Sequence, residues 1–557
     1  MTTKPIISSF TNLVPGQMTV PEQSLVLNAL EQLYSLVNEQ SVVIQSLRDE
    51  INQMKGEDGK PTISGKNQKA ITLEPRNVSS ESARKTFGKP RKNKPIKFDS
   101  SRPIDEIQKI EFLDKLALPV DVVFKGYAKS HYQSLEIRSK LIEVQRAIYY
   151  SATENKTYTA DLPAEYMLGS DYTQELKGHI GLFKFSLGLS IPKIGDFLRM
   201  HGIAITNGSV SNILLENGET LKSEQLTIHQ AGLELGLYET TDTTASRFNG
   251  VNYNTHVFGN EAYTAYFTRP HKDRQTIVDL IRFDAPRTYL LNEDTFKLYE
   301  YLKIPAKITK PLMPFVAIMN NKYLDQATFM GQIKAALNEE DYQKHEQKLL
   351  EGAYLSAYRA QTPLSILLCD DAPQYKLVAL LIAGCWVHAG RHFKKLNPKI
   401  IYHQRLLDEF SKRFWMFYQK LKDYKDKPFQ VDTKTALELD KEFDTLFDTK
   451  TGYEELDDRI QKTKDNKAEL LVVLKHPYVP LHNNDSELAV RKEVRYRDIS
   501  FQTRTQKGTQ AKDVFFTIIQ TSKKLGVNAY HYIMDRLNKK FSMTPLHILI
   551  EQKFCAV

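Results

Sequence analysis

The chain has 557 residues, of which 41% are apolar and 26% are charged, a composition typical of folded globular proteins. Its length is enough for three or four structural units with sizeable cores. Lysine and arginine exceed aspartate and glutamate by 76 to 67. The resulting net charge of +9 favours a polyanionic partner such as nucleic acid, without excluding a ribosomal or membrane-surface role.

Cysteine content and hydropathy exclude several classes of protein. The three cysteines, Cys369, Cys385 and Cys555, are too few and too scattered for a disulfide framework or a four-cysteine zinc site, so we expect a reducing compartment. The longest apolar run, Leu377–Val387, has 11 residues. A membrane-spanning helix needs about 20, so we predict that this run forms a buried helix. The N-terminal sequence lacks signal-peptide architecture, and we expect a cytoplasmic protein without membrane contact.

Residues 20–56 carry a heptad pattern that predicts a coiled coil. The "a" positions are Leu30, Val37, Ile44 and Ile51, and the "d" positions are Leu33, Gln40, Leu47 and Met54. Three β-branched "a" residues with leucine at two "d" positions favour a parallel two-stranded coiled coil, and hence a homodimer or higher oligomer. A helix packed on its own domain is the alternative interpretation.

Two segments of lower apolar periodicity follow. Residues 57–103 are predicted to be a flexible linker, and its basic stretch Arg84–Lys97 could hold DNA phosphates or simply be solvated. Residues 104–170 are predicted to form a small mixed domain, with strands around Leu135–Ile137 and Ile142–Tyr150. This small domain contains no cysteine, so we expect no zinc ligands there.

Residues 171–230 are predicted to form a helical DNA-binding domain with a helix-turn-helix at 190–216. Ser190 caps the first helix, Gly202 ends it, and Thr206 caps the second. The outer face of the second helix offers short polar side chains suited to phosphates and base edges. These candidate DNA-binding residues are Asn207, Ser209, Ser211 and Asn212. Two core-packed helices without DNA contact are the alternative.

From residue 235 onward the pattern becomes typical of β-strands, with a hairpin turn predicted at Gly259–Asn260. Asp242 lies in the first predicted strand. Farther along, the unbroken apolar run Ile366–Cys369 is typical of a strand that is buried on both faces. This run ends at Asp370-Asp371, which places a carboxylate at the carboxyl end of a strand.

Two motifs in the C-terminal part resemble the catalytic domain of bacterial transposases of the insertion sequence 66 family. The first is GCWVHAGRHF at Gly384–Phe393, and the second is the block from Leu481 to Asp535. Family members carry a pattern close to D-N-N-x-x-E-x-x-x-R, a basic stretch, and then a G-V-x-x-Y-x-Y helix. The matching residues are Asn483, Asn484, Glu487, Arg491 and Arg497, followed by Gly526, Val527, Tyr530 and Tyr532.

The resemblance implies a multidomain α+β protein whose residues 235–535 form a ribonuclease-H-like α/β catalytic domain. We expect an all-helical insertion at about 376–480 and a C-terminal tail at 536–557. Residues 283–360 are extra relative to the usual family pattern, and the resemblance assigns them no role.

The resemblance also makes Asp242, Asp370 and Glu487 the catalytic and metal-binding residues, two from strands and one from a later helix. Asp370 is selected because it stands five residues before Tyr375, as in the family's D-G-Y-x-x-Y pattern; Asp371 remains the alternative. Three carboxylates suit a pair of Mg²⁺ ions, or Mn²⁺, because hard cations select oxygen ligands and assist phosphodiester chemistry.

Other residues near these acids receive supporting roles from the resemblance. Those expected to support the active site are Trp386, His388, Asn483 and Asn484. Those expected to follow the DNA backbone are Arg491, Arg495, Arg497 and Lys507, with Lys512 on the same stretch. Cys385 and His388 have a metal-like spacing, but no second pair stands nearby in the sequence, so we expect no zinc there.

The function implied is that of a DDE transposase, a bacterial, nucleoid-associated enzyme. It would bind the terminal inverted repeats of its element, cleave double-stranded DNA and transfer the ends to a target, with accessory small transposition proteins as further partners. A structure-specific nuclease of the same fold and a catalytically inactive DNA-binding regulator are the alternatives.

Overall fold

The computed structural model describes residues 20–54, 104–109, 135–162, 170–319, 322–361, 363–425 and 430–555, with isolated positions between 127 and 166. The predicted linker at 57–103 lies outside the described residues. The chain divides into two units, one formed by residues up to Leu47 with those from Leu141 onward, and the other by residues between Arg48 and Lys140. The sheet, the flanking helices and the candidate site all belong to the first unit.

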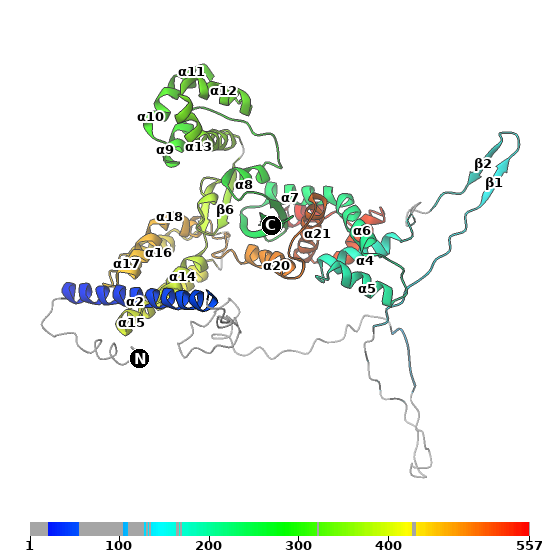
Figure 1. The fold of residues 1–557 in the computed structure, drawn as a ribbon, viewed down its shortest axis with the longest axis horizontal. Helices are drawn as coiled ribbons and strands as arrows, with labels where there is room; N and C mark the ends of the chain where they lie inside the picture. Colours follow the sequence, from blue (N-terminus) through cyan, green and yellow to red (C-terminus); the bar gives the residue numbers. More distant parts are fainter. Residues whose placement is uncertain are drawn as a thin grey trace, which may run out of the picture. The chain divides into compact units, whose positions relative to one another are not determined.

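A five-stranded mixed sheet has the strand order β5-β4-β3-β6-β7. Its strand β6 is labelled in Figure 1. The strands are β3 (Glu239–Phe248), β4 (Val251–Gly259), β5 (Thr264–Arg269), β6 (Leu364–Cys369) and β7 (Ala379–Gly384). The first three pair antiparallel, whereas β6 runs parallel to both β3 and β7. The predictions of strands around Asp242 and at Ile366–Cys369 are therefore confirmed.

The apolar run Leu377–Val387 corrects the sequence analysis, because it forms a strand where we predicted a buried helix. Its residues 379–384 are β7, which pairs in parallel with β6. A short, continuous apolar run has no periodicity that separates a buried strand from a buried helix. Helix α14 (Trp386–Lys395) begins only after Gly384.

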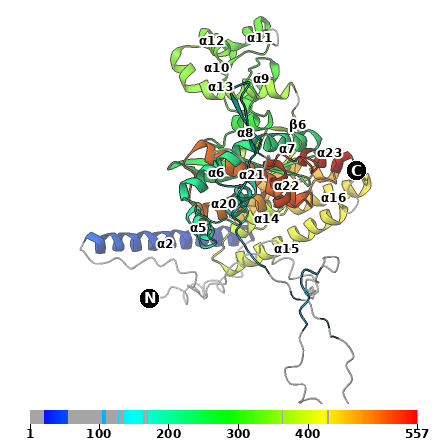
Figure 2. The same ribbon diagram turned by 90° about the vertical axis from the view of Figure 1, so that its right-hand side faces the viewer.

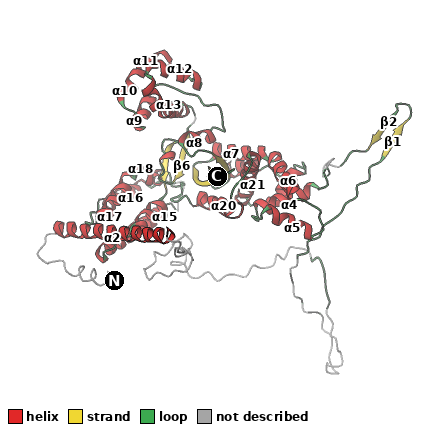
Figure 3. Ribbon diagram, in the orientation of Figure 1, coloured by secondary structure: helices red, strands yellow, loops and turns green. Residues whose placement is uncertain are grey.

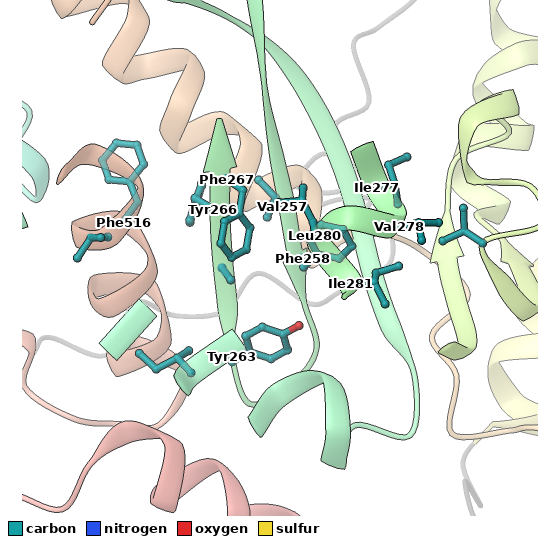
Figure 4. Close-up of a cluster of buried hydrophobic side chains, with 14 of the residues drawn as sticks. Val257, Phe258, Tyr263, Tyr266, Phe267, Ile277, Val278, Leu280, Ile281 and Phe516 are labelled. Atoms are coloured by element: carbon teal, nitrogen blue, oxygen red, sulfur yellow. The ribbon is translucent and has the colours of Figure 1, made fainter. Parts of the chain in front are cut away.

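Helices from both ends of the chain share one hydrophobic core with the sheet. The N-terminal ones are α4 (Gln174–Phe185), α5 (Ile191–Met200), α6 (Asn207–Thr220) and α7 (Lys222–Leu235). The C-terminal ones are α20 (Asn484–Ser500), α21 (Gln506–Lys524), α22 (Ala529–Leu537) and α23 (Leu546–Cys555). Helix α21 packs on β5 and α6, α22 on α4, and α23 on α7. In Figure 4, Phe516 of α21 and Ile277 of α8 (Arg274–Ile281) lie on opposite sides of the strands that carry Tyr266 and Val257.

This shared core changes two of the predicted domain boundaries. The helices at 174–235 are not a unit separate from the sheet, since Ile180, Val210 and Ile228 are fully buried in the same cluster as the strands. The predicted tail at 536–557 contains α23, whose Leu546 and Ile550 are also fully buried. The C-terminal segment therefore completes the core.

Two further sets of helices precede α20 in the chain, one between strands of the sheet and one after its last strand (Figure 3). After α8, the first set lies between β5 and β6 and comprises α9 (Glu293–Tyr301), α10 (Ala306–Thr309), α11 (Met313–Met319), α12 (Gln326–Ala336) and α13 (Glu339–Arg359). The second follows α14 and comprises α15 (Ile401–Tyr424), α16 (Thr433–Phe447), α17 (Glu454–Asp465), α18 (Lys467–Leu470) and α19 (Val472–Lys475). The second set has an aromatic core of its own, so the predicted helical insertion is present but starts after β7 and α14. No described helix combines the length and hydropathy that crossing a membrane requires.

Helix α2 (Val20–Met54) is one uninterrupted helix of 35 residues, drawn in blue in Figure 2. Its first half packs on the second helical set, where the Asn28 side-chain amide donates to the Gly452 carbonyl at 2.9 Å. The buried Glu31 carboxylate accepts hydrogen bonds from the Lys399 and Ile400 amides and pairs with His403.

The heptad positions of α2 face away from these contacts. Leu33, Val37, Ile44 and Leu47 are between 46 and 57% exposed. The alternative of a helix packed on its own domain thus holds for one face, while the four seam residues Leu33, Val37, Ile44 and Leu47 are exposed on another; the side chains of Ile51 and Met54 lie outside the described residues.

Within the small mixed domain predicted at 104–170, the described residues form a two-stranded hairpin of β1 (Ile148–Ser151) with β2 (Lys156–Thr159). Residues 135–147 form neither helix nor strand, so the strand predicted at Leu135–Ile137 is wrong. Leu135 is 83% exposed and Leu141 is fully exposed, so this segment buries little apolar surface that could stabilise a strand.

Candidate active site

Asp242 lies in the middle of β3, half-buried, and accepts a hydrogen bond from the Thr243 amide at 2.7 Å. The pKa of Asp242 is raised to about 7, chiefly by burial and also by the negative charges of Asp370 and Glu487. The hydrogen bond from Thr243 and the positive charge of Arg391 act in the opposite direction. The fold therefore brings Asp370 and Glu487 within electrostatic reach of Asp242.

Asp370 and Asp371 follow β6, and their surroundings distinguish them. The Asp370 carboxylate accepts a hydrogen bond from the Ala372 amide at 3.2 Å and acts electrostatically on Asp242. Asp371 instead pairs with Lys376 at 3.0 Å, and Lys376 also contacts Glu469 of α18. This arrangement favours Asp370 as the partner of Asp242.

The loop that carries both aspartates is held from two sides. Arg274 of α8 donates to the carbonyls of Pro373 and Lys376 at 2.8 and 2.7 Å. The buried Tyr375 hydroxyl lies 2.9 Å from the Thr243 hydroxyl, next to Asp242. These contacts fix the end of β6 relative to β3. In the sequence analysis Tyr375 served only to select Asp370, and its contact with Thr243 was not predicted.

Glu487 lies in the first turn of α20, which is pinned to β3 by side-chain hydrogen bonds. The buried side-chain amide of Asn483 donates to the Thr241 carbonyl at 2.6 Å, and the Ser486 hydroxyl donates to the Thr240 hydroxyl at 2.8 Å. Asn484 is the first residue of the helix and is half-buried. Thr240 and Thr241 immediately precede Asp242, so these hydrogen bonds hold the start of α20 beside the first aspartate.

The Glu487 carboxylate is bound on its other side by Arg391 of α14, with two hydrogen bonds of 2.9 and 2.8 Å. Arg391 also lies 3.1 Å from His388 Nε2, and His388 Nδ1 is 3.6 Å from Glu487 Oε1. Among the described residues, the potential metal-ligating atoms that lie within 4.8 Å of one another belong to Cys385, His388 and Glu487. The three acids do not form such a close group, because Glu487 is turned towards α14.

Several supporting predictions can be compared with the structure. Trp386 is fully buried and donates to the Leu470 carbonyl at 2.8 Å, so it joins α14 to the helical insertion and does not face the acids. Lys512 is wrong as a DNA-backbone residue, because it is 1% exposed and pairs with buried Glu493 at 2.8 Å. Arg497 is half-buried and donates to the Ala245 carbonyl.

The remaining basic candidates, Arg491, Arg495 and Lys507, are exposed. Arg491 and Arg495 lie on α20, one and two turns after Glu487, and Lys507 lies at the start of α21. Their charge is therefore accessible on the surface that continues from the acids.

The helix-turn-helix prediction matches two helices, α5 and α6. Ser190 accepts from the Lys193 amide and Thr206 from the Ser209 amide, so both predicted caps are confirmed. Asn207 and Asn212 are exposed and Ser211 is half-buried. The Ser209 hydroxyl lies 2.9 Å from the Thr206 hydroxyl and belongs to the cap, which leaves it less free to bind DNA.

The acids fit the divalent ions that the resemblance implies. Their donors are carboxylate oxygens, which Mg²⁺ and Mn²⁺ prefer. The raised pKa of Asp242 comes from burial and from two like charges nearby, and a bound cation would relieve both effects.

Two comparisons with known proteins bear on the family of this chain. The sequence profile described as "Transposase IS66 family" matches residues 338–511, which include Asp370 and Glu487. The chain is also 30% identical over 327 residues to the uncharacterized protein y4jO of Sinorhizobium fredii (strain NBRC 101917 / NGR234), an alignment that covers 58% of this chain and 99% of that protein. The motifs and the family profile agree, and the chain belongs to the transposase IS66 family.

Proposed function

We propose that this chain is a DDE transposase that binds the terminal inverted repeats of an insertion sequence, cleaves the DNA and joins the ends to a target. One observation carries the proposal: Asp370 from the end of β6 and Glu487 from α20 lie close enough to Asp242 of β3 for their negative charges to raise its pKa. Two acids from adjacent strands and one from a later helix is the arrangement expected of a ribonuclease-H-like domain.

Asp242, Asp370 and Glu487 would hold the divalent ions. When bound, such ions supply charge stabilisation at the phosphorus and activation of the attacking oxygen. The protein's own residues provide the positions. The Tyr375–Thr243 contact orients the Asp370 loop, while Asn483 and Ser486 hold the start of α20 on β3. Glu487 must turn from Arg391 towards the two aspartates to complete the set.

DNA would contact the exposed basic residues around α20 and the polar face of α6. Arg491, Arg495 and Lys507 suit phosphate contacts, which position a duplex without reading its sequence. Asn207 and Asn212 are exposed amides at the start and middle of α6, and asparagine can pair with adenine edges in the major groove. The nuclease alternative shares all these residues, and only joining of the cut ends separates it from a transposase.

The test is cleavage and strand transfer on DNA that carries the element ends, with Glu487→Gln as the principal variant. Glutamine keeps the shape but removes the charged oxygen, so Mg²⁺-dependent cleavage should be lost while end binding persists. Asp498→Asn removes one charge from an exposed position of the same helix and should cut at nearly the wild-type rate. Asp371→Asn should retain activity and Asp370→Asn should lose it. Cleavage by Glu487→Gln at the wild-type rate would show that this active site is wrong.

A further inference from the structure

A second set of potential metal ligands shares Glu487 with the proposed catalytic acids. The Cys385 thiol, the His388 imidazole and the Glu487 carboxylate each offer a donor atom, and these atoms lie within 4.8 Å of one another. His388 Nδ1 is buried without a hydrogen-bond partner and lies 3.6 Å from Glu487 Oε1. The C-x-x-H spacing alone provides two ligands, and the fold adds the third from a helix about 100 residues later.

The donor set selects a particular class of cation. Thiolate and imidazole are ligands for Zn²⁺ and similar borderline metals, whereas Mg²⁺ takes oxygen donors. We propose that Cys385, His388 and Glu487 form a site for Zn²⁺ or a chemically similar ion such as Co²⁺. Three protein ligands leave a fourth tetrahedral position open for water.

The surroundings of this cluster supply the further contacts that metal sites commonly have. The backbone amide of Asn483 donates to Cys385 Sγ at 3.3 Å, a contact that orients the thiolate. Arg391 contacts Glu487 and His388 Nε2, and it must leave Nε2 when Nδ1 binds a metal, because the imidazole then carries its proton on Nε2. A pocket whose lining includes Cys385, His388, His392 and Thr463 borders two of the three ligands.

The consequence for activity rests on the proposed function. Glu487 cannot face α14 and complete the set with Asp242 and Asp370 at the same time. A bound Zn²⁺ replaces the thiol proton of Cys385, which passes to solvent, and holds Glu487 in its position towards α14. Zinc is therefore an inhibitor that competes with Mg²⁺ for one carboxylate.

The direct test is titration of the full-length protein with Co²⁺ under reducing conditions, followed by the charge-transfer absorption of a cobalt–thiolate bond. Wild-type protein should develop this band, and Cys385→Ser should lose it. Cys555→Ser removes the exposed cysteine at the end of α23 and should keep the band. His388→Gln retains the thiol and should raise the Co²⁺ Kd by about tenfold or more. Absence of the band, its survival in Cys385→Ser, or an unchanged Kd in His388→Gln would overturn the site.

A second measurement separates this inference from the proposed function. Zn²⁺ should inhibit Mg²⁺-dependent cleavage by the wild type, and Cys385→Ser should need about tenfold more Zn²⁺ for half-inhibition relative to its own uninhibited rate. A Co²⁺ band in a protein that never cleaves DNA would refute the transposase activity and leave the metal site standing. Cleavage without any Co²⁺ band, or equal zinc sensitivity in both proteins, would refute the metal site alone.

Discussion

Glu487 is the residue on which the candidate site depends, because it has partners on two sides. Its helix is fixed to β3 beside Asp242, yet its carboxylate is bound by Arg391 of α14. A bidentate arginine–carboxylate pair is among the stronger polar contacts, although the Arg391 side chain is 43% exposed and therefore partly screened by water. The arginine and a catalytic cation compete for the same oxygens.

This competition predicts the effect of Arg391→Ala on metal affinity. Loss of the guanidinium removes a positive charge and frees Glu487, so the affinity for Mn²⁺ should rise by about two- to fivefold, the range of a partly exposed ion pair. Titration of Mn²⁺ followed by electron paramagnetic resonance measures it. Lys395→Ala removes the same charge from an exposed position on α14 and should leave the affinity nearly unchanged. A weaker Mn²⁺ affinity in Arg391→Ala would contradict the competition.

A buried histidine away from the acids gives the fold a pH dependence. Burial lowers the pKa of His229 in α7 to about 4, and its hydrogen bond to the Leu280 carbonyl opposes that effect only in part. The unfolded histidine has a pKa of about 6.5. Below pH 6.5, His229 therefore binds a proton in the unfolded chain but not in the folded protein. The free energy of unfolding consequently decreases as the pH falls towards 4.

The expected loss at about pH 5 is about 2 kcal/mol from this one group. The His229→Gln variant keeps a donor for the Leu280 carbonyl but does not titrate. Its urea midpoint should therefore change less between about pH 7.5 and about pH 5 than that of the wild type. Parallel pH profiles for the two proteins would show that the histidine is not neutral in the fold.

At the scale of helices and strands, the features that depend on neighbouring residues were predicted from the sequence better than those that depend on tertiary contacts. The caps at Ser190 and Thr206 and the buried run at Ile366–Cys369 were predictable because each depends on a few adjacent residues. Asn249-Gly250, with φ values of 45° and 81°, joins β3 to β4 and carries the dipeptide that most strongly predicts a tight hairpin, so this missed turn had a readable signal. Strand β7 had no such local signal, because its extended conformation depends on pairing with β6.

The same distinction applies to the site. The acids followed from motifs, whereas the Arg391–Glu487 pair joins residues 96 positions apart and no local pattern specifies it. The Tyr375–Thr243 and Asn483–Thr241 ties are likewise products of tertiary packing. Lys512 was predicted to contact DNA because it lies in a basic stretch, but it is buried and pairs with Glu493.

Helix α6 carries a prediction about sequence recognition. If it enters the major groove, Asn207→Ala and Asn212→Ala should each reduce the preference for element ends by about 1–3 kcal/mol per lost base contact. Non-specific affinity should hardly change, since phosphate contacts dominate it. Competition binding with end DNA and random DNA measures both quantities. Glu219→Gln, at an exposed position near the end of the same helix, is the matched control. Equal loss on both DNAs would point to a phosphate-only role or a folding defect.

At the scale of the whole molecule, α2 has two usable faces. The hydrogen bonds to the helical insertion come from Ser24, Asn28, Glu31 and Gln32. The heptad positions Leu30, Leu33, Val37, Gln40, Ile44 and Leu47 point, at 100° per residue, about 150° away from that face. Docking on the insertion therefore leaves the predicted seam open to a second copy of the helix. Transposition joins two DNA ends to one target, and such a pairing would hold two catalytic domains together.

The two faces can be separated by mutation. Val37→Lys with Ile44→Lys places charges at two "a" positions, where lysines from two helices would face each other across an apolar core. We predict that this variant sediments as a monomer at tens of micromolar, binds a single DNA end and fails to pair ends. Glu31→Ala removes the carboxylate that caps α15 but leaves the seam intact, so it should still dimerise while α2 becomes more sensitive to proteolysis. If the double-lysine variant dimerises as the wild type does, or if the wild type is itself a monomer at that concentration, the seam has no role in assembly.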